Sequence, residues 1–294
     1  MEIRVLRYFL TVAREENISA AAEFLHLTQP TLSRQLMDLE KELGAKLFFR
    51  GKRKITLTDE GVLLRRRAEE IIDLVNKTEA DLMSDDHIIG GDIYIGSGET
   101  YAMKTVARVI KDIVEQYPDI HFHFFSGNAE DVTERLDKGL LDFGILIQPA
   151  ILEKYNSLRL PVMDTWGILM RRDSPLAEKS VIRPSDLWDV PLLGSRQRLV
   201  SGSIAKWLKK DYEKLNIVAT YNLIYNAALL VEEGIGYALC LDNLVNAGPD
   251  SSLCFRPLEP PLEASLDMVW KKYQVFSKAA DLFLSKVQTE FSKS

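Results

Sequence analysis

The stretch Ser19–Lys54 reads SAAAEFLHLTQPTLSRQLMDLEKELGAKLFFRGKRK, and it marks both ends of one helix. Pro30 fits the first turn of a helix, where its missing N–H costs no hydrogen bond. The residue before a proline avoids helical backbone angles, so we expect Thr28 or Gln29 to cap this helix. Leucines then recur at spacings of three and four residues until Gly44, a residue typical of helix ends. The sequence therefore predicts a helix that begins just after Thr28 or Gln29 and stops at Gly44.

Two further helices are expected before this one. Apolar residues at helical spacing predict a helix over residues 3–15. Ser19 is the expected N-cap of a second helix, whose alanines at 20–22 permit close approach of a neighbour. The short break HLTQP then joins the second helix to the third, which is typical of a helix-turn-helix. An ordinary helical hairpin has the same periodicity, so composition has to decide between the two.

Composition favours DNA binding. The third helix carries small polar side chains at its N-terminal end, where they suit base edges and phosphates. The segment KLFFRGKRKITLTDEG then predicts two short strands, Leu47–Arg50 and Lys54–Thr58, around a turn at Gly51. Residues 46–54 hold five basic side chains and no acidic one, in a chain of net charge −6. A solvated hairpin can carry such charges for solubility alone, but beside a helix-turn-helix, phosphate contact explains them better.

The segment Ala20–Gly61 resembles the N-terminal signature of LysR-type transcriptional regulators. That signature is an alanine run, a TQPxLSRQIxxLExxLGxxLFxR core and then LTxxG. The chain matches it almost without a break; Leu36 stands at a frequent isoleucine position, and Phe49 lies in a variable gap. The resemblance implies a winged helix-turn-helix that binds double-stranded operator DNA. A symmetric dimer would bind an inverted repeat.

The expected DNA contacts come from the third helix, in the major groove, and from the basic wing, on phosphates or in the minor groove. The predicted DNA-binding residues are Gln29, Pro30, Thr31, Ser33, Arg34, Arg50, Lys52, Arg53 and Lys54.

Residues 58–86 read as one long helix with an apolar seam. The seam residues are spaced 4, 3, 4, 3, 4 and comprise Leu64, Ala68, Ile71, Val75, Thr78 and Leu82. The alternative is a helix packed on its own domain. We favour a dimer seam because the wing ends at Thr58 and leaves little for the helix to pack against. The resemblance likewise implies a homodimer through this linker helix; the family often forms homotetramers, and a contact with RNA polymerase stays open.

From Gly90 onward, strands and helices alternate, which predicts parallel sheets covered by helices. Two such halves joined by crossing strands leave a cleft at the carboxyl ends of the strands. Element order and fragments such as YPDIHFHFFSG, LDKGLLDFGIL and LVEEGIGYAL resemble the family's effector domain, which is similar to periplasmic binding proteins. We therefore expect an α/β fold class with an N-terminal winged helix-turn-helix and a C-terminal periplasmic-binding-protein-like domain of two α/β subdomains.

The expected boundaries follow from these elements. The winged helix-turn-helix takes residues 1–58, the linker helix 59–89 and the effector-binding domain 90–294. Within that domain, subdomain I comprises about 90–161 and 267–294, and subdomain II comprises about 162–266.

Polar residues at strand ends are the candidate contacts of a small-molecule effector. They are Ser97, Gly98, Glu99, Thr100, Gln148, Ser195, Arg196, Gln197 and Asn222. The hydroxyls of Ser97 and Thr100 would suit an anionic ligand at a helix N-terminus, unless they only cap the helix. A Glu99 that faces the cleft would repel a carboxylate and favour an amine or zwitterion. A Glu99 that only stabilises a helix dipole would leave a small carboxylate as the ligand.

Motifs for nucleotide binding, metal binding, redox chemistry and catalysis are incomplete or absent in the sequence. GSGETY lacks the third glycine of a dinucleotide fingerprint, and no Walker-type lysine follows, so we expect no nucleotide cofactor. His121 and His123 share one side of a strand without a third metal ligand, which favours a plain strand face over a metal site. Cys240 and Cys254 lack CxxC spacing and suit a reducing cytoplasm. No nucleophile elbow or His–carboxylate constellation is evident, so the chain is not expected to be an enzyme.

The sequence thus predicts a cytoplasmic LysR-type regulator with no membrane segment or signal peptide, controlled by an effector of unknown identity. One rival is an enzyme or solute-binding module with a helical oligomerisation arm, which would need neither TQPTLSRQ nor a basic wing. Another is a winged-helix protein whose C-terminal domain contacts proteins and binds no ligand. A thermal-shift screen separates that rival, because a true ligand stabilises the folded protein by mass action.

Overall fold

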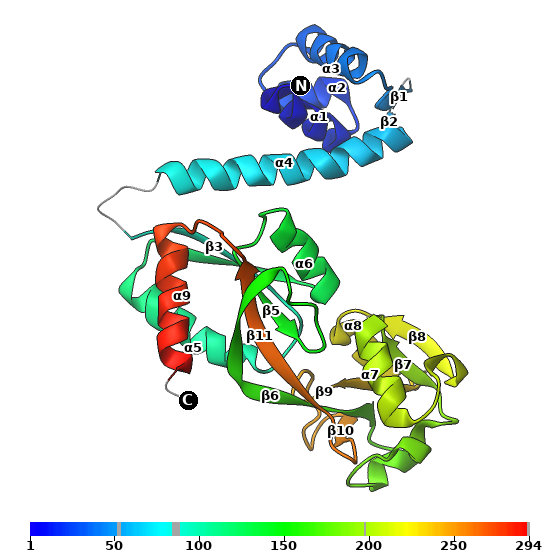
Figure 1. Ribbon diagram of the computed structural model, residues 1–294. Helices are drawn as coiled ribbons and strands as arrows, with labels where there is room; N and C mark the ends of the chain where they lie inside the picture. Colours follow the sequence, from blue (N-terminus) through cyan, green and yellow to red (C-terminus); the bar gives the residue numbers. More distant parts are fainter. Residues whose placement is uncertain (52–53, 84–88, 197, 293–294) are drawn as a thin grey trace. The chain divides into compact units, whose positions relative to one another are not determined.

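The computed structural model describes residues 1–51, 54–83, 89–196 and 198–292, and it divides into two compact units (Figure 1). The units are Met1–Met83 and Ser84–Ser294. The first contains α1 (Ile3–Glu15), α2 (Ile18–Phe24), α3 (Gln29–Leu43), β1 (Phe48–Arg50), β2 (Ile55–Leu57) and α4 (Asp59–Met83).

Helix α3 stops at the predicted glycine and begins after Thr28, one of the two predicted caps. Thr28 is its N-cap, and the Thr28 hydroxyl oxygen accepts the N–H of Thr31 at 3.4 Å. Gly44 closes the helix with φ of 66°, a left-handed conformation that glycine adopts without strain. For α2 the predicted cap is wrong: the side chain of Asn17 accepts the N–H groups of Ser19 and Ala20. Ser19 is therefore inside the helix and not at its boundary.

A single apolar core joins the three helices and the hairpin. Phe9, Leu32 and Leu36 are fully buried in it. The hairpin is fixed to α3 by the buried carboxylate of Glu40, which accepts the N–H of Leu47 at 2.8 Å. A buried carboxylate needs such partners, because burial without hydrogen bonds is costly.

Helix α4 packs on its own unit, which corrects the reason given for a dimer seam. Ala68 and Ile72 are buried in the core that α1 also lines, and Leu64 and Ile71 are packed against it. The alternative of a helix packed on its own domain therefore holds for the first half of the seam. Thr78 is exposed and donates its hydroxyl hydrogen to the carbonyl of Leu74. The side chain of Leu82 lies outside the described residues.

The C-terminal unit contains a mixed sheet with helices on both faces (Figure 1). Its helices and strands, in chain order, are β3 (Gly91–Ser97), α5 (Met103–Gln116), β4 (Ile120–Ser126), α6 (Ala129–Asp137), β5 (Phe143–Ile147), β6 (Tyr155–Arg171), β7 (Leu192–Ser195), α7 (Arg198–Leu208), β8 (Ile217–Tyr221), α8 (Ile224–Glu232), β9 (Tyr237–Leu241), β10 (Leu253–Pro257), β11 (Glu263–Lys271) and α9 (Lys278–Phe291). Short 3-10 helices occupy Pro175–Glu178, Pro184–Leu187 and Tyr212–Lys214.

Two long antiparallel strands, β6 and β11, connect two halves of this unit. The strand order is β4-β3-β5-β11-β6-β9-β7-β8, and β10 pairs with β6 outside this path. In the first half, β3 pairs in parallel with β4 and β5; in the second half, β7 pairs in parallel with β8 and β9. The parallel pairs turn the carboxyl ends of their strands toward one edge in each half.

Alternating side chains cover both faces of each half-sheet. Ile93 and Ile95 pack under α5 and α9, whereas Leu146 packs under α6. In the second half, Leu192 packs with α7 and Leu193 packs with α8. Because successive strand residues point to opposite faces, this alternation makes two three-layer α/β halves.

Several predicted elements are displaced or were missed. The sequence pattern after Gly90 predicts a helix over residues 100–115, but α5 begins at Met103, because residues 100–102 form a hydrogen-bonded turn in which the N–H of Met103 bonds the carbonyl of Thr100. The 17-residue strand β6 and the strand β10 were not assigned from the sequence. The same pattern predicts a helix over Ala129–Asp137, and α6 has these bounds.

Candidate functional site

The N-terminal end of α3 presents polar side chains to solvent. Gln29, Pro30, Thr31 and Arg34 are exposed, and Ser33 is half-buried. The hydroxyls of Thr28 and Thr31 lie 2.8 Å apart and hold the first turn together. Met37 and Lys41 extend the exposed face that begins at Arg34, since residues three, four and seven apart share one face of a helix. The sequence analysis did not select these two residues, because a methionine between leucines reads as part of the core.

The wing is a tight antiparallel hairpin. Phe49 lies opposite Thr56, and the N–H of Gly51 bonds the carbonyl of Lys54 at 3.1 Å to close the turn. A Cβ on Gly51 would lie 2.7 Å from that carbonyl oxygen, so the turn requires glycine. Lys52 and Arg53, and the side chain of Arg50, lie outside the described residues.

Lys54 carries an ion pair within the unit. Its Nζ lies 2.5 Å from a carboxylate oxygen of Glu16, and both side chains are about half exposed. Exposed pairs of this kind contribute little to stability, so a phosphate oxygen can replace the carboxylate at small cost.

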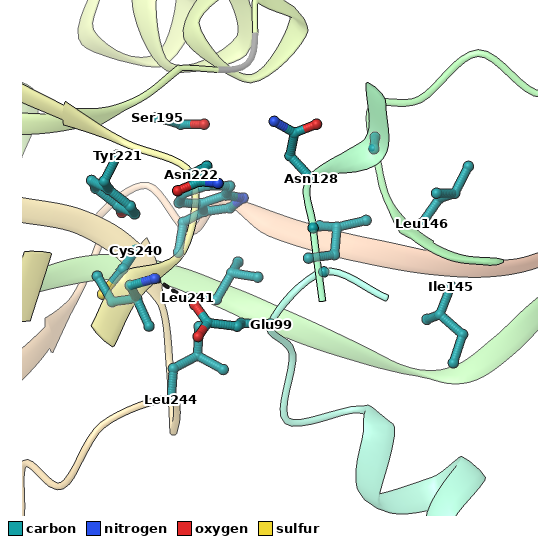
Figure 2. Close-up of a pocket in the computed structure, with 16 residues that line it drawn as sticks. Glu99, Asn128, Ile145, Leu146, Ser195, Tyr221, Asn222, Cys240, Leu241 and Leu244 are labelled. Atoms are coloured by element: carbon teal, nitrogen blue, oxygen red, sulfur yellow. Dashed lines mark hydrogen bonds between the residues drawn. The ribbon is translucent and has the colours of Figure 1, made fainter. Parts of the chain in front are cut away.

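A cavity opens between the two halves of the C-terminal unit, at the carboxyl ends of strands from both (Figure 2). Its volume is about 60 Å³, several times the space that one water molecule requires. Gly98, Glu99, Ser195 and Asn222, all predicted effector contacts, line it. Strand ends of two facing half-sheets are the expected place for a ligand in α/β folds.

Other residues predicted to contact the effector form hydrogen bonds within the protein. Ser97 is buried and donates its hydroxyl hydrogen to the carbonyl of Gly98. Thr100 is also buried; its hydroxyl donates to Asp164 and accepts the N–H of Ala102. The Thr100 hydroxyl thus stabilises the turn before α5 but does not cap the helix, because the N-cap residue of α5 is Ala102 and, among the described residues, no side chain bonds the N–H groups of its first turn.

Gln148 and Arg196 also point elsewhere. The Gln148 amide donates to a carboxylate oxygen of Asp267 at 2.7 Å and accepts the N–H of Ala150. Arg196 is exposed, and its backbone N–H bonds the carbonyl of Tyr221. Neither residue lines the cavity. Gln197 lies outside the described residues.

Among the lining residues that were not predicted, three carry amide or aromatic side chains. Asn128 caps α6 in a reciprocal arrangement with Asp131, a pattern that GNAED contains in the sequence. Trp166 comes from β6, which the sequence analysis did not assign as a strand. Tyr221 ends β8, and its hydroxyl donates to the carbonyl of Leu239. The remaining lining side chains are mostly aliphatic, so the cavity joins an apolar surface to a few polar groups.

A hydrogen bond joins the two halves across the cavity. The carboxylate of Glu99, from the first half, accepts the N–H of Ile224 at the start of α8 in the second half (Figure 2). The N-cap residue of α8 is Leu223, whose side chain cannot accept a hydrogen bond. Glu99 therefore supplies the acceptor that the helix N-terminus lacks, and the partial positive charge there favours a carboxylate.

Cys240 lines the cavity as a protonated thiol. Burial raises its pKa to about 12, which keeps the nucleophilic thiolate scarce at neutral pH. Cys254 is buried as well, and both cysteines are free.

A buried carboxylate lies beside the cavity. Asp164, on β6, is 4% exposed, and burial raises its pKa; the hydrogen bond from Thr100 lowers it and the charge of Asp242 raises it further. Thr100 belongs to the loop after β3, so this hydrogen bond ties that loop to a crossing strand.

In the described part of the chain, no three His, Cys, Asp or Glu side chains gather in a way that could hold a metal ion. His123 bonds Asp92 at 2.9 Å and stacks on Tyr94, while His121 is exposed on the same strand. Within the same described ranges, no helix combines the length and the apolar character needed to cross a membrane.

Comparisons with known proteins agree with both units. The family profile described as "Bacterial regulatory helix-turn-helix protein, lysR family" matches residues 3–62, and "LysR substrate binding domain" matches residues 89–292. The chain is 28% identical to the Hca operon transcriptional activator HcaR of Escherichia coli (strain K12), across 98% of this chain and 97% of that protein. It is 36% identical to the HTH-type transcriptional regulator BsdA of Bacillus subtilis (strain 168), across 49% of this chain and 50% of that protein.

Solved structures share the fold. CbnR, a LysR family transcriptional regulator, superposes with a TM-score of 0.76 over 99% of both chains at 18% identity. The structure of full-length CbnR in complex with its target DNA gives a TM-score of 0.74, covering 98% of this chain and 99% of that one at 19% identity. With a helix-turn-helix profile at one end and a substrate-binding profile over most of the rest, the chain belongs to the LysR family of DNA-binding transcriptional regulators.

Proposed function

We propose that residues 1–58 bind an inverted-repeat operator, with α3 in the major groove and the wing on the sugar-phosphate backbone. The observation that carries this proposal is the exposed polar start of α3, where Gln29, Pro30, Thr31 and Arg34 face solvent. Arginine reads guanine edges through two hydrogen bonds, and helix N-termini favour phosphate. Ser33 and the basic residues of the wing, Arg50, Lys52, Arg53 and Lys54, complete the proposed interface.

The protein would act as a homodimer through the linker helix, residues 59–89. After α4 has packed on its own unit, Leu63 and Leu74 stay 61% and 42% exposed. These two leucines are eleven residues apart and therefore lie on one face of the helix. A second copy of α4 would cover this face and hold two α3 helices for the two half-sites. Two such dimers would form the homotetramer that the family resemblance implies.

Residues 90–294 would sense the effector in the cavity between their two halves, as the substrate-binding match supports. Gly98, Glu99, Ser195 and Asn222 are the predicted contacts that the lining supports, and Asn128, Trp166 and Tyr221 join them. A ligand that binds one arrangement of the two halves more tightly would shift the domain toward it and so alter operator binding or promoter activation. A regulator that binds operator DNA would act in the cytoplasm.

Operator binding in the presence and absence of candidate effectors tests this function. We expect the affinity of the full chain for captured operator fragments, or the transcription they drive, to change with an effector that also raises the melting temperature. Ser195→Ala and Trp166→Ala should weaken both responses together, because both side chains line the cavity. An effector whose action is untouched by either substitution would assign the sensing site to another surface.

A further inference from the structure

The cavity between the two halves is lined by a carboxylate of the protein itself, the side chain of Glu99. An anionic ligand at this site would be drawn to the start of α8, where backbone N–H groups and the helix dipole favour negative charge. The Glu99 carboxylate already accepts the N–H of Ile224 at that point. Glu99 is half-buried and reaches Ile224 from the opposite half of the domain.

The rest of the described lining offers no compensating positive charge. None of its residues is a lysine, arginine or histidine, and Arg196 is exposed outside it. The lining also contains the polar side chains of Asn128, Ser195 and Asn222, which are neutral (Figure 2). A carboxylate ligand would therefore meet a like charge at short range, and it could reach the α8 N-terminus only by displacing Glu99.

A ligand with a positive charge would instead be attracted by the carboxylate of Glu99. A carboxylate has two oxygens and can accept several hydrogen bonds, so Glu99 can keep its bond to Ile224 and accept a second one from an ammonium group. The amide oxygen of Asn128, from the first half, and the hydroxyl oxygen of Ser195, from the second, are further acceptors in the lining. The aliphatic and aromatic lining then suits a small apolar body.

We infer that Glu99 fills the anion position of this cavity, so that the site rejects small carboxylates and selects a small apolar amine or another compact cation. The inference rests on the proposed function, since it names the ligand class of the same cavity. It makes Glu99 the specificity-determining residue of the effector domain and a bridge between its two halves.

The test uses the full-length protein, its melting temperature and three probes with the same branched four-carbon skeleton: isobutylamine hydrochloride, isobutyramide and sodium isobutyrate. The two salts are compared with sodium chloride of equal ionic strength, and the neutral amide is compared with buffer alone. For the wild type we expect stabilisation by the amine and none by the isobutyrate or the amide. Glu99→Gln keeps an oxygen acceptor for Ile224 but removes the charge, so the preference for the amine over the amide should be lost.

Glu99→Ala empties the anion position and provides a second, independent readout. Acetate should then bind beside α8 and raise the melting temperature of this variant, with an affinity about tenfold higher than for the wild type, the factor expected of a charge at a partly buried helix N-terminus. Asp281→Ala is the matched control. It removes a carboxylate from the first turn of α9, outside the cavity, and should leave the response to every probe as in the wild type.

Stabilisation of the wild type by isobutyrate equal to that by isobutylamine would overturn the inference, and so would a lack of any response to isobutylamine. Equal acetate responses in wild type and Glu99→Ala would do the same. The proposed function has its own outcome: if the probe preferences follow Glu99 as expected but operator binding and promoter activity ignore every ligand of the cavity, the ligand class stands and effector control fails.

Discussion

The hydroxyl of Thr100 donates a hydrogen bond to the buried carboxylate of Asp164, and this bond links the loop after β3 to the crossing strand β6. The two residues are 64 positions apart, so only the folded chain brings them together. Ala102 donates its N–H to the same hydroxyl at 3.0 Å. The turn that leads into α5 and the strand that joins the two halves therefore share one polar contact next to the cavity.

Asp164 predicts a pH dependence of stability. Burial raises its pKa above the usual carboxyl value of about 4. In the interval between the unfolded and the folded pKa, the folded state binds more protons, so the free energy of unfolding falls as pH rises through that interval and is constant above it. Asp164→Asn keeps an oxygen that can accept from Thr100 and removes the titration. The wild type should therefore lose stability relative to Asp164→Asn as pH rises, by about 1.4 kcal/mol for each unit of the raised pKa.

Denaturant unfolding of both proteins across the acidic range measures this difference, and carboxylates that do not interact with Asp164 cancel because they are common to both. A wild-type-minus-variant difference that is flat with pH, or that grows in the wild type's favour as pH rises, would contradict the assignment.

Glu40 predicts a stability effect in the N-terminal unit. Its carboxylate is 5% exposed and accepts the N–H of Leu47, so Glu40→Ala leaves a buried donor without a partner. Such a loss costs about 1–3 kcal/mol. Asp38→Ala is the control, because Asp38 is exposed on the same helix. Equal unfolding free energies for the two variants would show that the wing does not depend on Glu40.

The two kinds of DNA contact predict different binding phenotypes. Arg34→Ala should cost about 1–3 kcal/mol on the operator and relax specificity at the base that Arg34 reads. Lys54→Ala should weaken binding to all sequences alike and reduce the salt slope by about one unit. Titrations at several salt concentrations on operator and unrelated DNA separate the two. An Arg34→Ala, Lys54→Ala double variant with wild-type operator affinity would remove both residues from the interface.

The exposed face of α4 predicts the assembly. A Leu63→Asp, Leu74→Asp variant should place unpaired charges in the interface and shift the protein to monomers in sedimentation velocity. Operator affinity should fall with it, because both half-sites must be engaged together. Val62→Asp is the matched control on a face about 100° away. Ile71→Asp differs from both: Ile71 packs on the unit's own core, so this change should lower its unfolding free energy.

A dimer that survives in the Leu63→Asp, Leu74→Asp variant, or one that Val62→Asp disrupts equally, would place the interface on another surface.

The ends of α3 could be predicted because local chemistry decides them: a proline begins the helix and a glycine ends it. The strand β6 could not, since Pro161 and Asp164 interrupt a segment whose two halves pair with different partners. Because β6 was not predicted, Trp166 was not recognised as a lining residue of the cavity. The cavity itself was predictable from the order of strands, and Glu99, Ser195 and Asn222 followed from it. The hydrogen-bond partner of Glu99 could not be predicted, because only the packing of the two halves brings Ile224 close to Glu99.

The central claim is sequence-specific operator binding by α3, and capture of genomic DNA fragments by the full-length protein, followed by sequencing, tests it most directly. We predict that the wild type enriches fragments with one shared inverted repeat. Fragments retained by Arg34→Ala should contain the same repeat with a weaker base preference at one position in each half-site. The account would be contradicted by captured fragments with no common motif, or by an unchanged motif and enrichment in Arg34→Ala.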